Sequence, residues 1–182
     1  MSATEKVITV HDKKFMPFIE PATLQKRIHE IATQLNADFK NKQPLFLAIL
    51  NGSFMFAADI FRQIELEAEI CFVKLSSYEG TKSSGKVISY MGLDVDITNR
   101  HIILLEDIID TGRTLSTFLP QLQEKKPASL SIATLLHKPE AALFPISIQY
   151  CGFTIPNLFV LGYGLDYNGL GRNLPGLYQL TT

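Results

Sequence analysis

The sequence predicts an α/β fold with a mostly parallel central sheet flanked by helices. Three segments, 45–50, 69–76 and 101–105, have the length of strands and are rich in apolar residues. Such segments are typical of the central strands of parallel sheets, which are buried on both faces. Helical patterns alternate with these strands along the chain, and this alternation favours a parallel sheet.

The expected elements begin with a helix at 21–40. Leu24, Ile28, Ile31 and Leu35 recur at spacings of four, three and four, which gives the helix one apolar stripe. The remaining expected elements, in chain order, are a strand at 45–50, a helix at 54–64 with Ser53 as its N-cap, strands at 69–76, 86–90 and 101–105, a helix at 113–125, and strands at 129–136 and 159–161.

The length of 182 residues is near the usual size of one domain, so we expect a single domain over residues 1–182. The portion from about 145 to 182 is rich in Gly, Pro and Tyr and has little helical period. We expect it to form a small irregular hood over the edge of the sheet. Hydrophobic residues make up 46% of the chain and charged residues 19%, which argues against disorder.

Composition also excludes several classes of protein. The apolar runs are too short to cross a bilayer, and residues 1–10 do not resemble a secretory signal. The formal net charge is −1, so no nucleic-acid partner is expected. Cys71 and Cys151 are too few for a disulfide framework and lack the spacing of a metal site, and we expect two buried, reduced thiols. These observations predict a cytoplasmic protein without a membrane partner.

The residues that point to chemistry follow the strand at 101–105. Ligands of parallel α/β sheets bind at the carboxyl ends of the strands. Two adjacent carboxylates, Glu106 and Asp107, follow directly after the last apolar residue of this strand. Neighbouring side chains of an extended segment point in opposite directions, so these acids suit ribose hydroxyls or a magnesium ion better than a matched acid–base pair. By themselves they could equally be solvated loop acids.

The next residues, Asp110 to Thr114, open the helix expected at 113–125. Gly112 lets the backbone approach an anion closely, and the free N–H groups of a helix N-terminus can hold a phosphate monoester. The hydroxyls of Thr111 and Thr114 can donate further hydrogen bonds. A capping turn is the alternative for this segment alone, but its position between a buried strand and a helix favours a ribose-phosphate site. The sequence lacks the G-x-x-x-x-G-K-[ST] pattern of a nucleotide P-loop.

Residues 104–115 closely resemble the phosphoribosyl pyrophosphate motif of type I phosphoribosyltransferases, and the chain is similar to their hypoxanthine–guanine branch from about Leu45 to Arg172. Supporting stretches are Leu-Asn-Gly-Ser at 50–53, Leu-Ser-Ser-Tyr at 75–78, Leu-Leu-His-Lys at 135–138 and Phe-Val-Leu-Gly-Tyr-Gly-Leu-Asp-Tyr-Asn at 159–168. The resemblance implies the type I phosphoribosyltransferase fold. It also implies a Mg²⁺-dependent enzyme of purine salvage that transfers the 5-phosphoribosyl group of phosphoribosyl pyrophosphate to N9 of hypoxanthine or guanine, giving IMP or GMP and pyrophosphate.

The resemblance further implies a role for each matching residue. Asp110 would exchange the proton of purine N7, which suits a positioned carboxylate. Without the resemblance, Lys138 could equally be a surface charge and Phe159 a core aromatic. The other implied contacts are the ribose hydroxyls or magnesium with Glu106 and Asp107, the 5-phosphate with Thr111, Gly112, Arg113 and Thr114, the purine O6 with Lys138, the purine ring with Phe159, its edge with the backbone of Val160, a second magnesium ion with Asp166, and pyrophosphate with Arg172.

Two loops are expected beside the reaction centre. Asn51-Gly52 resembles the pyrophosphate loop, where the family often has Lys-Gly and an unusual cis peptide. Asn51 removes one cation, whereas Gly52 still permits a close backbone approach. Ser77 and Tyr78, with the polar residues up to 86, resemble a mobile lid that would shield a cation-like ribose from water. A hairpin loop without a catalytic part is the alternative for this lid.

Other interpretations stay open at this stage. The chain could be a regulatory protein that senses phosphoribosyl pyrophosphate and binds nucleic acid, although it has neither a basic excess nor an added domain. It could act on adenine, xanthine, orotate or uracil instead. Lys138 and the stretch 159–166 favour a 6-oxopurine, which xanthine would also satisfy. The resemblance suggests a homodimer or homotetramer, and the sequence ranks neither the purines nor the oligomeric states.

Overall fold

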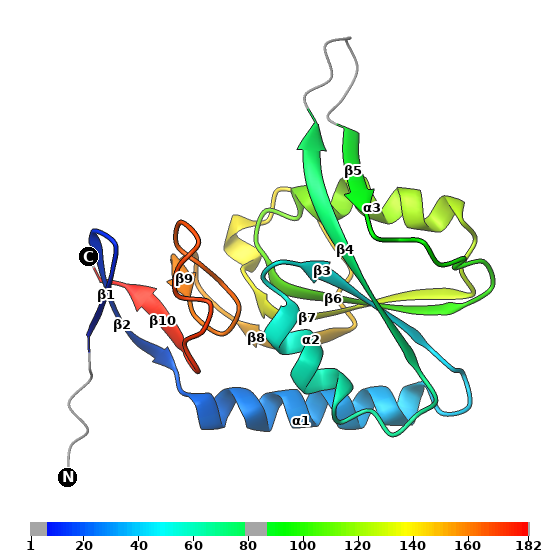
Figure 1. Ribbon diagram of the computed structural model, residues 1–182, viewed down its shortest axis with the longest axis horizontal. Helices are drawn as coiled ribbons and strands as arrows, with labels where there is room; N and C mark the ends of the chain where they lie inside the picture. Colours follow the sequence, from blue (N-terminus) through cyan, green and yellow to red (C-terminus); the bar gives the residue numbers. More distant parts are fainter. Residues whose placement is uncertain (1–6, 79–86, 182) are drawn as a thin grey trace.

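The computed structural model describes residues 7–78 and 87–181, with side chains left out of the description from 76 to 91. Its strands form two separate sheets (Figure 1). The elements in chain order are β1 (Ile8–Val10), β2 (Lys13–Ile19), α1 (Pro21–Asp38), β3 (Leu45–Leu50), α2 (Phe54–Phe61), β4 (Glu69–Tyr78), β5 (Val87–Met91), β6 (His101–Ile109), α3 (Arg113–Glu124), β7 (Ser129–His137), a 3₁₀ turn (Pro139–Ala141), β8 (Tyr150–Thr154), β9 (Val160–Leu161) and β10 (Leu177–Leu180).

The larger sheet has the strand order β5-β4-β3-β6-β7-β8. Its strands from β4 to β8 in that order are parallel, and β5 pairs antiparallel with β4 at one edge. This arrangement confirms the predicted α/β fold with a mostly parallel sheet. Because the parallel strands share one direction, the residues that follow β3, β6 and β7 meet at the same edge of the sheet.

Strand β3 shows why its sequence is apolar without interruption. Phe46 and Ala48 pack into a core that also contains apolar residues of α1 and α2. Leu45 and Leu47 belong to a second core, together with Phe118 of α3. Alternate side chains of a strand point to opposite faces, so a strand between two helical layers is apolar at every position. Figure 1 shows α1 and α2 on one side of the sheet and α3 on the other.

The smaller sheet is antiparallel and has the order β1-β2-β10-β9. Half of it comes from the N-terminal residues 8–19, which the sequence analysis did not assign to any strand. The segment expected to be a strand at 159–161 is β9, and it lies in this sheet rather than beside the parallel strands. Strand β8, which was also not predicted, instead extends the larger sheet next to β7.

Two local predictions hold only in part. Ser53 is the N-cap residue of α2, as expected, but its hydroxyl donates to the carbonyl oxygen of Ile49 at 2.5 Å and makes no capping hydrogen bond. The strand expected to end at residue 105 continues as β6 to Ile109. Its ladder pairs Glu106 with Thr134 of β7, so the paired backbone carries the strand past the point where its apolar character ends. The backbone hydrogen bonds of the ladder outweigh the local loss of hydrophobicity.

The remaining general expectations concern membranes and thiols. Over the described parts of the chain, no helix combines the length and the apolar character that crossing a membrane requires. Cys71 and Cys151 are free thiols, as expected. Both are half-buried rather than buried, and this partial burial still raises the pKa of each thiol. The difference arises because each cysteine lies on a strand near an edge of the larger sheet.

Candidate active site

The sequence-predicted site residues gather where three adjacent strands end. Asn51 follows β3, Asp110 follows β6 and Lys138 follows β7. Because β3, β6 and β7 are neighbours in the order of the sheet, their carboxyl ends form one continuous edge. The fold therefore brings a turn, a carboxylate and a cation to one sheet edge, although they lie 28 to 87 positions apart in the sequence.

Glu106 lies within the part of β6 that pairs with β7 and is buried there. Its Oε2 atom is buried and has no hydrogen-bond partner. Burial raises the pKa of this carboxyl well above its ordinary value, and the charge of Asp107 beside it raises the pKa further. An orphaned acceptor of this kind is costly in a folded protein, so the strand holds a polar group that a ligand or cation can satisfy.

Asp107 points away from Glu106 and toward the loop after β3, as adjacent strand residues do. Its Oδ1 accepts a hydrogen bond from the backbone N–H of Ile108 at 3.0 Å. Burial raises the pKa of this carboxyl to about 6, although that hydrogen bond and the positive charge of Arg172 oppose the rise. The side chain is thus a desolvated carboxylate placed close to a cation without a direct ion pair between them.

The loop at 51–53 is held between two other parts of the site. The peptide bond between Leu50 and Asn51 is cis, which agrees with the resemblance described above. A Cβ atom at position 52 would overlap the carboxylate of Asp107, so any residue other than glycine would force that side chain to move. On the other side, a Cβ atom at Gly164 would collide with the carbonyl oxygen of Gly52. The loop backbone therefore contacts both the end of β6 and the segment after β9.

Arg172 and Asp166 lie on that second segment. Arg172 Nη2 is 2.6 Å from Asp166 Oδ1, and Arg172 Nη1 donates to the carbonyl oxygen of Gly164 at 2.7 Å. The other carboxylate oxygen of Asp166 accepts from the N–H of Gly169 at 2.7 Å. Both charged side chains are about 70% covered. The structure thus places a cation and a carboxylate on the segment whose backbone contacts the loop at 51–53, and their binding roles stay a prediction from the sequence.

The predicted phosphate loop has the expected form. Gly112 precedes α3 with a φ of 75°, a left-handed conformation that favours glycine. The side chains of Arg113 and Thr114 are exposed at the start of the helix. Thr111 is held in place by the segment after β7, because its carbonyl oxygen accepts hydrogen bonds from two backbone N–H groups of that segment, at 3.0 Å each. Residues Glu106 and Ile108 to Leu115 line a cleft of about 90 Å³ at this helix N-terminus.

Asp110 and Lys138 form an ion pair at the ends of β6 and β7. Lys138 Nζ is 3.1 Å from Asp110 Oδ2. The lysine side chain is only 8% exposed, whereas that of Asp110 is 44% exposed. The backbone N–H of Lys138 also donates to the carbonyl oxygen of Ile109. Lys138 is therefore not the solvated surface charge that its sequence context alone allowed.

Phe159 and Val160 belong to the smaller sheet. The Phe159 ring is 45% exposed, and it packs against Phe15 and Tyr167 with ring centroids 6.1 and 5.7 Å apart. Val160 is buried and pairs with Gln179 of β10. Phe159 is thus not an ordinary core aromatic, because nearly half of it faces solvent. Sequence reasoning missed Phe15 and Tyr167, and their place beside Phe159 depends on a strand that was not predicted.

The expected lid falls mostly outside the described structure. Ser77 and Tyr78 end β4, and their backbones pair with Ile88 and Val87 of β5. Their side chains, and all of residues 79–86, lie outside the described residues. The lid therefore stays a prediction from the sequence.

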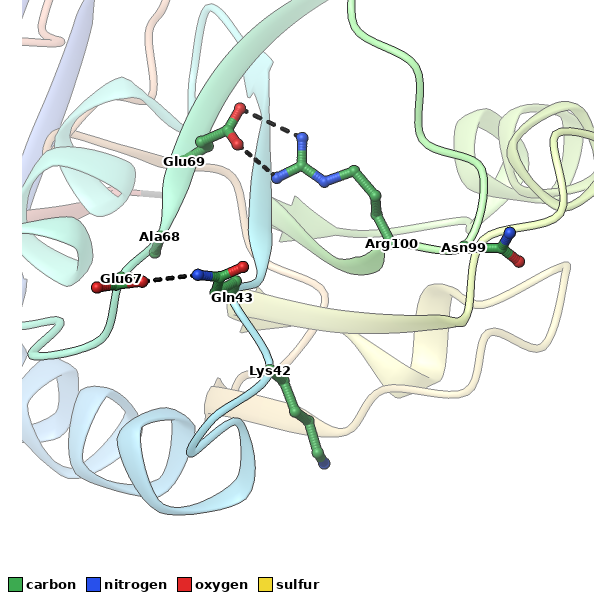
Figure 2. A pocket seen from close by; sticks show the side chains of 7 residues that line it. All are labelled: Lys42, Gln43, Glu67, Ala68, Glu69, Asn99 and Arg100. Carbon is green, nitrogen blue, oxygen red and sulfur yellow. Dashed lines mark hydrogen bonds and ion pairs between the residues drawn. The ribbon is translucent and has the colours of Figure 1, made fainter.

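A second cavity lies at the opposite, amino-terminal end of the sheet (Figure 2). It has a volume of about 540 Å³ and lies beside the first residues of β4 and β6. Its charged groups satisfy one another: Arg100 donates to both carboxylate oxygens of Glu69, at 3.2 and 2.8 Å, and Gln43 donates to Glu67 at 2.6 Å. Ligands of such sheets bind at the carboxyl ends of the strands, so the smaller cleft there is the candidate active site.

Buried carboxylates beside a glycine-bearing helix N-terminus suit a ligand that carries both hydroxyls and a phosphate. Residues 21–168 match the phosphoribosyl transferase domain family, and the chain belongs to that family.

Its relatives within the family are hypoxanthine–guanine phosphoribosyltransferases. The enzyme of that name from Streptococcus pneumoniae is 40% identical over 172 residues, covering 94% of this chain and 90% of the relative. The hypoxanthine-guanine-xanthine phosphoribosyltransferase of Tritrichomonas foetus is 39% identical over 153 residues, or 84% of each chain. The crystal structure of a hypoxanthine phosphoribosyltransferase from Staphylococcus aureus superposes with a TM-score of 0.85 and 37% identity, covering 91% of this chain and 90% of that one.

Proposed function

We propose that this chain catalyses purine salvage by transferring the 5-phosphoribosyl group of phosphoribosyl pyrophosphate to N9 of hypoxanthine or guanine. The products are IMP or GMP and pyrophosphate. The observation that carries this proposal is the ion pair between Lys138 and Asp110, 3.1 Å apart at two adjacent strand ends.

The spacing of Lys138 and Asp110 suits one edge of a 6-oxopurine. N7 and O6 are neighbours on that edge, and O6 is an acceptor. The ammonium group of Lys138 would donate to O6, while the carboxylate of Asp110 would accept the proton of N7. Adenine carries an amino donor at the same place, which Lys138 would repel. The pair therefore favours hypoxanthine and guanine over adenine.

The other residues are proposed to hold phosphoribosyl pyrophosphate. The N-terminus of α3, with Gly112 and the residues from Thr111 to Thr114, would bind the 5-phosphate through backbone N–H groups and hydroxyls. The loop at Asn51-Gly52 and the guanidinium group of Arg172 would bind the pyrophosphate. Phe159, with its exposed ring, would stack on the purine, and the backbone of Val160 would pair with its edge.

Magnesium fits the carboxylates that are present. Across the parts of the chain that the structure describes, no group of three potential His, Cys, Asp or Glu ligands occurs together. Mg²⁺ does not need such a group, because it usually keeps several waters and binds through one or two carboxylates together with substrate phosphates. The orphaned Oε2 of Glu106 or the buried carboxylate of Asp107 would hold one such ion, and Asp166 would hold a second. Bound there, Mg²⁺ would neutralise the negative charge of the pyrophosphate.

The chain's own residues would then carry out the proton transfer. The bond from C1′ to the pyrophosphate oxygen breaks, the bond from C1′ to N9 forms, and the proton on N7 moves to Asp110. The cation Lys138 stays at O6, and Arg172 stabilises the negative charge that develops on pyrophosphate. In the reverse reaction Asp110 returns the proton to N7.

The chain's organisation and setting complete the proposal. We expect one phosphoribosyltransferase domain over 1–182, with a hood that includes the C-terminal portion from about 145. We also expect a cytoplasmic homodimer or homotetramer that binds phosphoribosyl pyrophosphate and a 6-oxopurine, and neither nucleic acid nor membrane.

The test is product formation from phosphoribosyl pyrophosphate and Mg²⁺ with hypoxanthine, guanine, xanthine or adenine in separate reactions. Turnover of hypoxanthine or guanine, without turnover of adenine, is the expected result. Xanthine is included because the Tritrichomonas foetus relative is named for it. Binding of phosphoribosyl pyrophosphate without turnover of any purine would contradict the proposal and favour a regulatory sensor.

A further inference from the structure

A buried tyrosine links the segment that carries Arg172 to the helix that follows the loop at 51–53. Tyr163 lies two residues after β9 and is only 2% exposed. Its hydroxyl donates to Asp59 Oδ2 on α2 at 2.5 Å. The same oxygen accepts Nε2 of Gln25 from α1 at 2.7 Å. One carboxylate oxygen thus joins three separate elements through two hydrogen bonds.

The residue after the tyrosine makes a second contact with the same loop. The backbone of Gly164 lies so close to the carbonyl oxygen of Gly52 that a Cβ atom at 164 would collide with it. The carbonyl oxygen of Gly164 in turn accepts the guanidinium group of Arg172 at 2.7 Å. Gly164 therefore lies directly between the loop after β3 and the arginine.

Helix α2 connects these two contacts. It starts at Phe54, immediately after the loop, and the N–H of Ala57 donates to the carbonyl oxygen of Ser53 at 2.8 Å. Asp59 lies on the same short helix. The start of the segment 163–172 is therefore fastened to α2 through Tyr163, and the next residue, Gly164, contacts the loop that precedes α2.

We propose that Tyr163, through Asp59, is a positioning residue that sets the distance between the loop at 51–53 and Arg172. This inference rests on the proposed function, in which both groups bind the pyrophosphate of phosphoribosyl pyrophosphate. Misplacing one group relative to the other weakens the binding of that substrate, because both must contact the same diphosphate. The purine contacts of Lys138 and Asp110 belong to other strand ends and are left in place.

The hydroxyl remains a donor at any pH at which the protein is assayed. Burial raises the pKa of Tyr163 far above its ordinary value, and the hydrogen bond to Asp59 raises the pKa further. The link therefore does not depend on pH within the working range, and the kinetic consequence of removing it should not either.

A second tyrosine in the same chain supplies a matched control. Tyr150 on β8 is 8% exposed, and its hydroxyl donates to Asp38 Oδ2 at the end of α1 at 2.7 Å. Burial is also the main cause that raises its pKa. The two tyrosines make the same kind of bond at similar burial, but the Tyr150 bond lies away from the candidate site. Comparing Tyr163→Phe with Tyr150→Phe separates the loss of such a bond in general from its loss at this place.

The experiment measures kcat and KM for hypoxanthine, for phosphoribosyl pyrophosphate and, in reverse, for pyrophosphate, in the full chain with Mg²⁺. Tyr163→Phe should raise the KM values for phosphoribosyl pyrophosphate and pyrophosphate about tenfold, the effect of losing one charge-assisted hydrogen bond. The KM for hypoxanthine should change less than about twofold. Tyr150→Phe should lower the melting temperature to a similar degree and leave all three KM values unchanged.

Variants of the acceptor provide a rescue test. Asp59→Asn keeps an oxygen that can accept from both Tyr163 and Gln25, so it should behave nearly as the unmodified chain does. Asp59→Ala removes the acceptor and should reproduce the KM changes of Tyr163→Phe. Equal KM changes in both tyrosine variants, a matching rise in the KM for hypoxanthine, or no change in Tyr163→Phe would each overturn the inference. Absence of activity in the unmodified chain would instead contradict the proposed function.

Discussion

The two ends of the parallel sheet differ in how their charged side chains are paired. At the amino end, Arg100 and Glu69 form a bidentate ion pair and satisfy one another. At the carboxyl end, Glu106 is buried with an unpaired oxygen, and the pKa of Asp107 is raised to about 6 by burial. The amino end therefore holds a self-sufficient ion pair, whereas the carboxyl end holds, beside its own ion pairs, a buried acidic pair with one unsatisfied oxygen.

The difference separates charges that serve the fold from charges that serve a ligand. A buried carboxylate without a partner destabilises the protein that carries it. Such a group persists at a site where a substrate or a cation supplies the missing partner. Cavity volume alone would have selected the wrong end, because the space beside Arg100 measures about 540 Å³ and the cleft at the start of α3 only about 90 Å³.

The largest effect is expected from Asp110→Asn at the carboxyl end. An amide cannot take the N7 proton, so kcat should fall by about 10²- to 10⁴-fold, the usual contribution of a general base. The affinity for phosphoribosyl pyrophosphate, measured by calorimetry, should change little, because the change spares the groups that hold the phosphates. Equal losses in kcat and in that affinity would argue against a role in proton transfer.

The second prediction concerns stability, and its sign follows from the pKa of Asp107. Because burial raises that pKa from 3.8 to about 6, the folded chain holds the proton more tightly than the unfolded chain does. The contribution of Asp107 to stability is thus fully present below pH 4 and is lost as the pH rises through 6. Asp107→Asn should therefore raise the free energy of unfolding at pH 8 by about 3 kcal/mol, with no gain near pH 4.

Chemical unfolding at both pH values, with a chelator to remove Mg²⁺, checks this prediction. Asp94→Asn is the control, because Asp94 is exposed and its change should alter stability by less than about 0.5 kcal/mol. The Asp107 variant should lose activity while it gains stability, as expected of a residue kept for function. A variant that is less stable than the parent at pH 8 would show that the carboxylate is satisfied within the fold.

The third prediction concerns the partner of Asp110. Lys138→Met keeps the length of the side chain but removes the charge and the donor. The KM for hypoxanthine should rise about tenfold, and the preference for hypoxanthine over adenine should shrink, because a hydrogen bond to a charged group is lost. Lys125→Met, at an exposed position after α3, is the control and should leave both values unchanged. A rise confined to the KM for phosphoribosyl pyrophosphate would place Lys138 elsewhere in the site.

Much of the larger sheet could be predicted because burial on two faces leaves a plain pattern. The strand at 45–50 is apolar at every position, and both of its faces are covered by helices. The acids after residue 105 and the glycine at 112 could also be recognised, because they follow directly after an apolar strand and end its apolar pattern. The end of β6 was misplaced because its ladder with β7 continues through polar residues, and only pairing with another strand reveals that.

The smaller sheet was harder to predict because it is short and half-exposed. Strands β1, β9 and β10 have three, two and four residues, too few to show a period. The partners of Phe159 depend on this sheet, since Phe15 comes from the opposite end of the chain. In the sequence, Tyr163 is one aromatic residue among several in a glycine-rich stretch. Its hydrogen bond to Asp59 joins residues that lie 104 positions apart. Contacts of that range have no local signal.

The smallest effect is expected at the amino end, from Glu69→Gln. The Glu69 side chain is 62% exposed, so solvent screens its pair with Arg100, and the free energy of unfolding should fall by less than about 1 kcal/mol. The kinetic constants should stay as they are, because this pair lies at the far end of the sheet from Asp110. Urea unfolding at low and high salt, with steady-state assays, checks both points. A change in the KM for phosphoribosyl pyrophosphate would mean that the pair at the amino end affects substrate binding at the carboxyl end. The charges at the amino end would then serve the function of the protein as well as its fold.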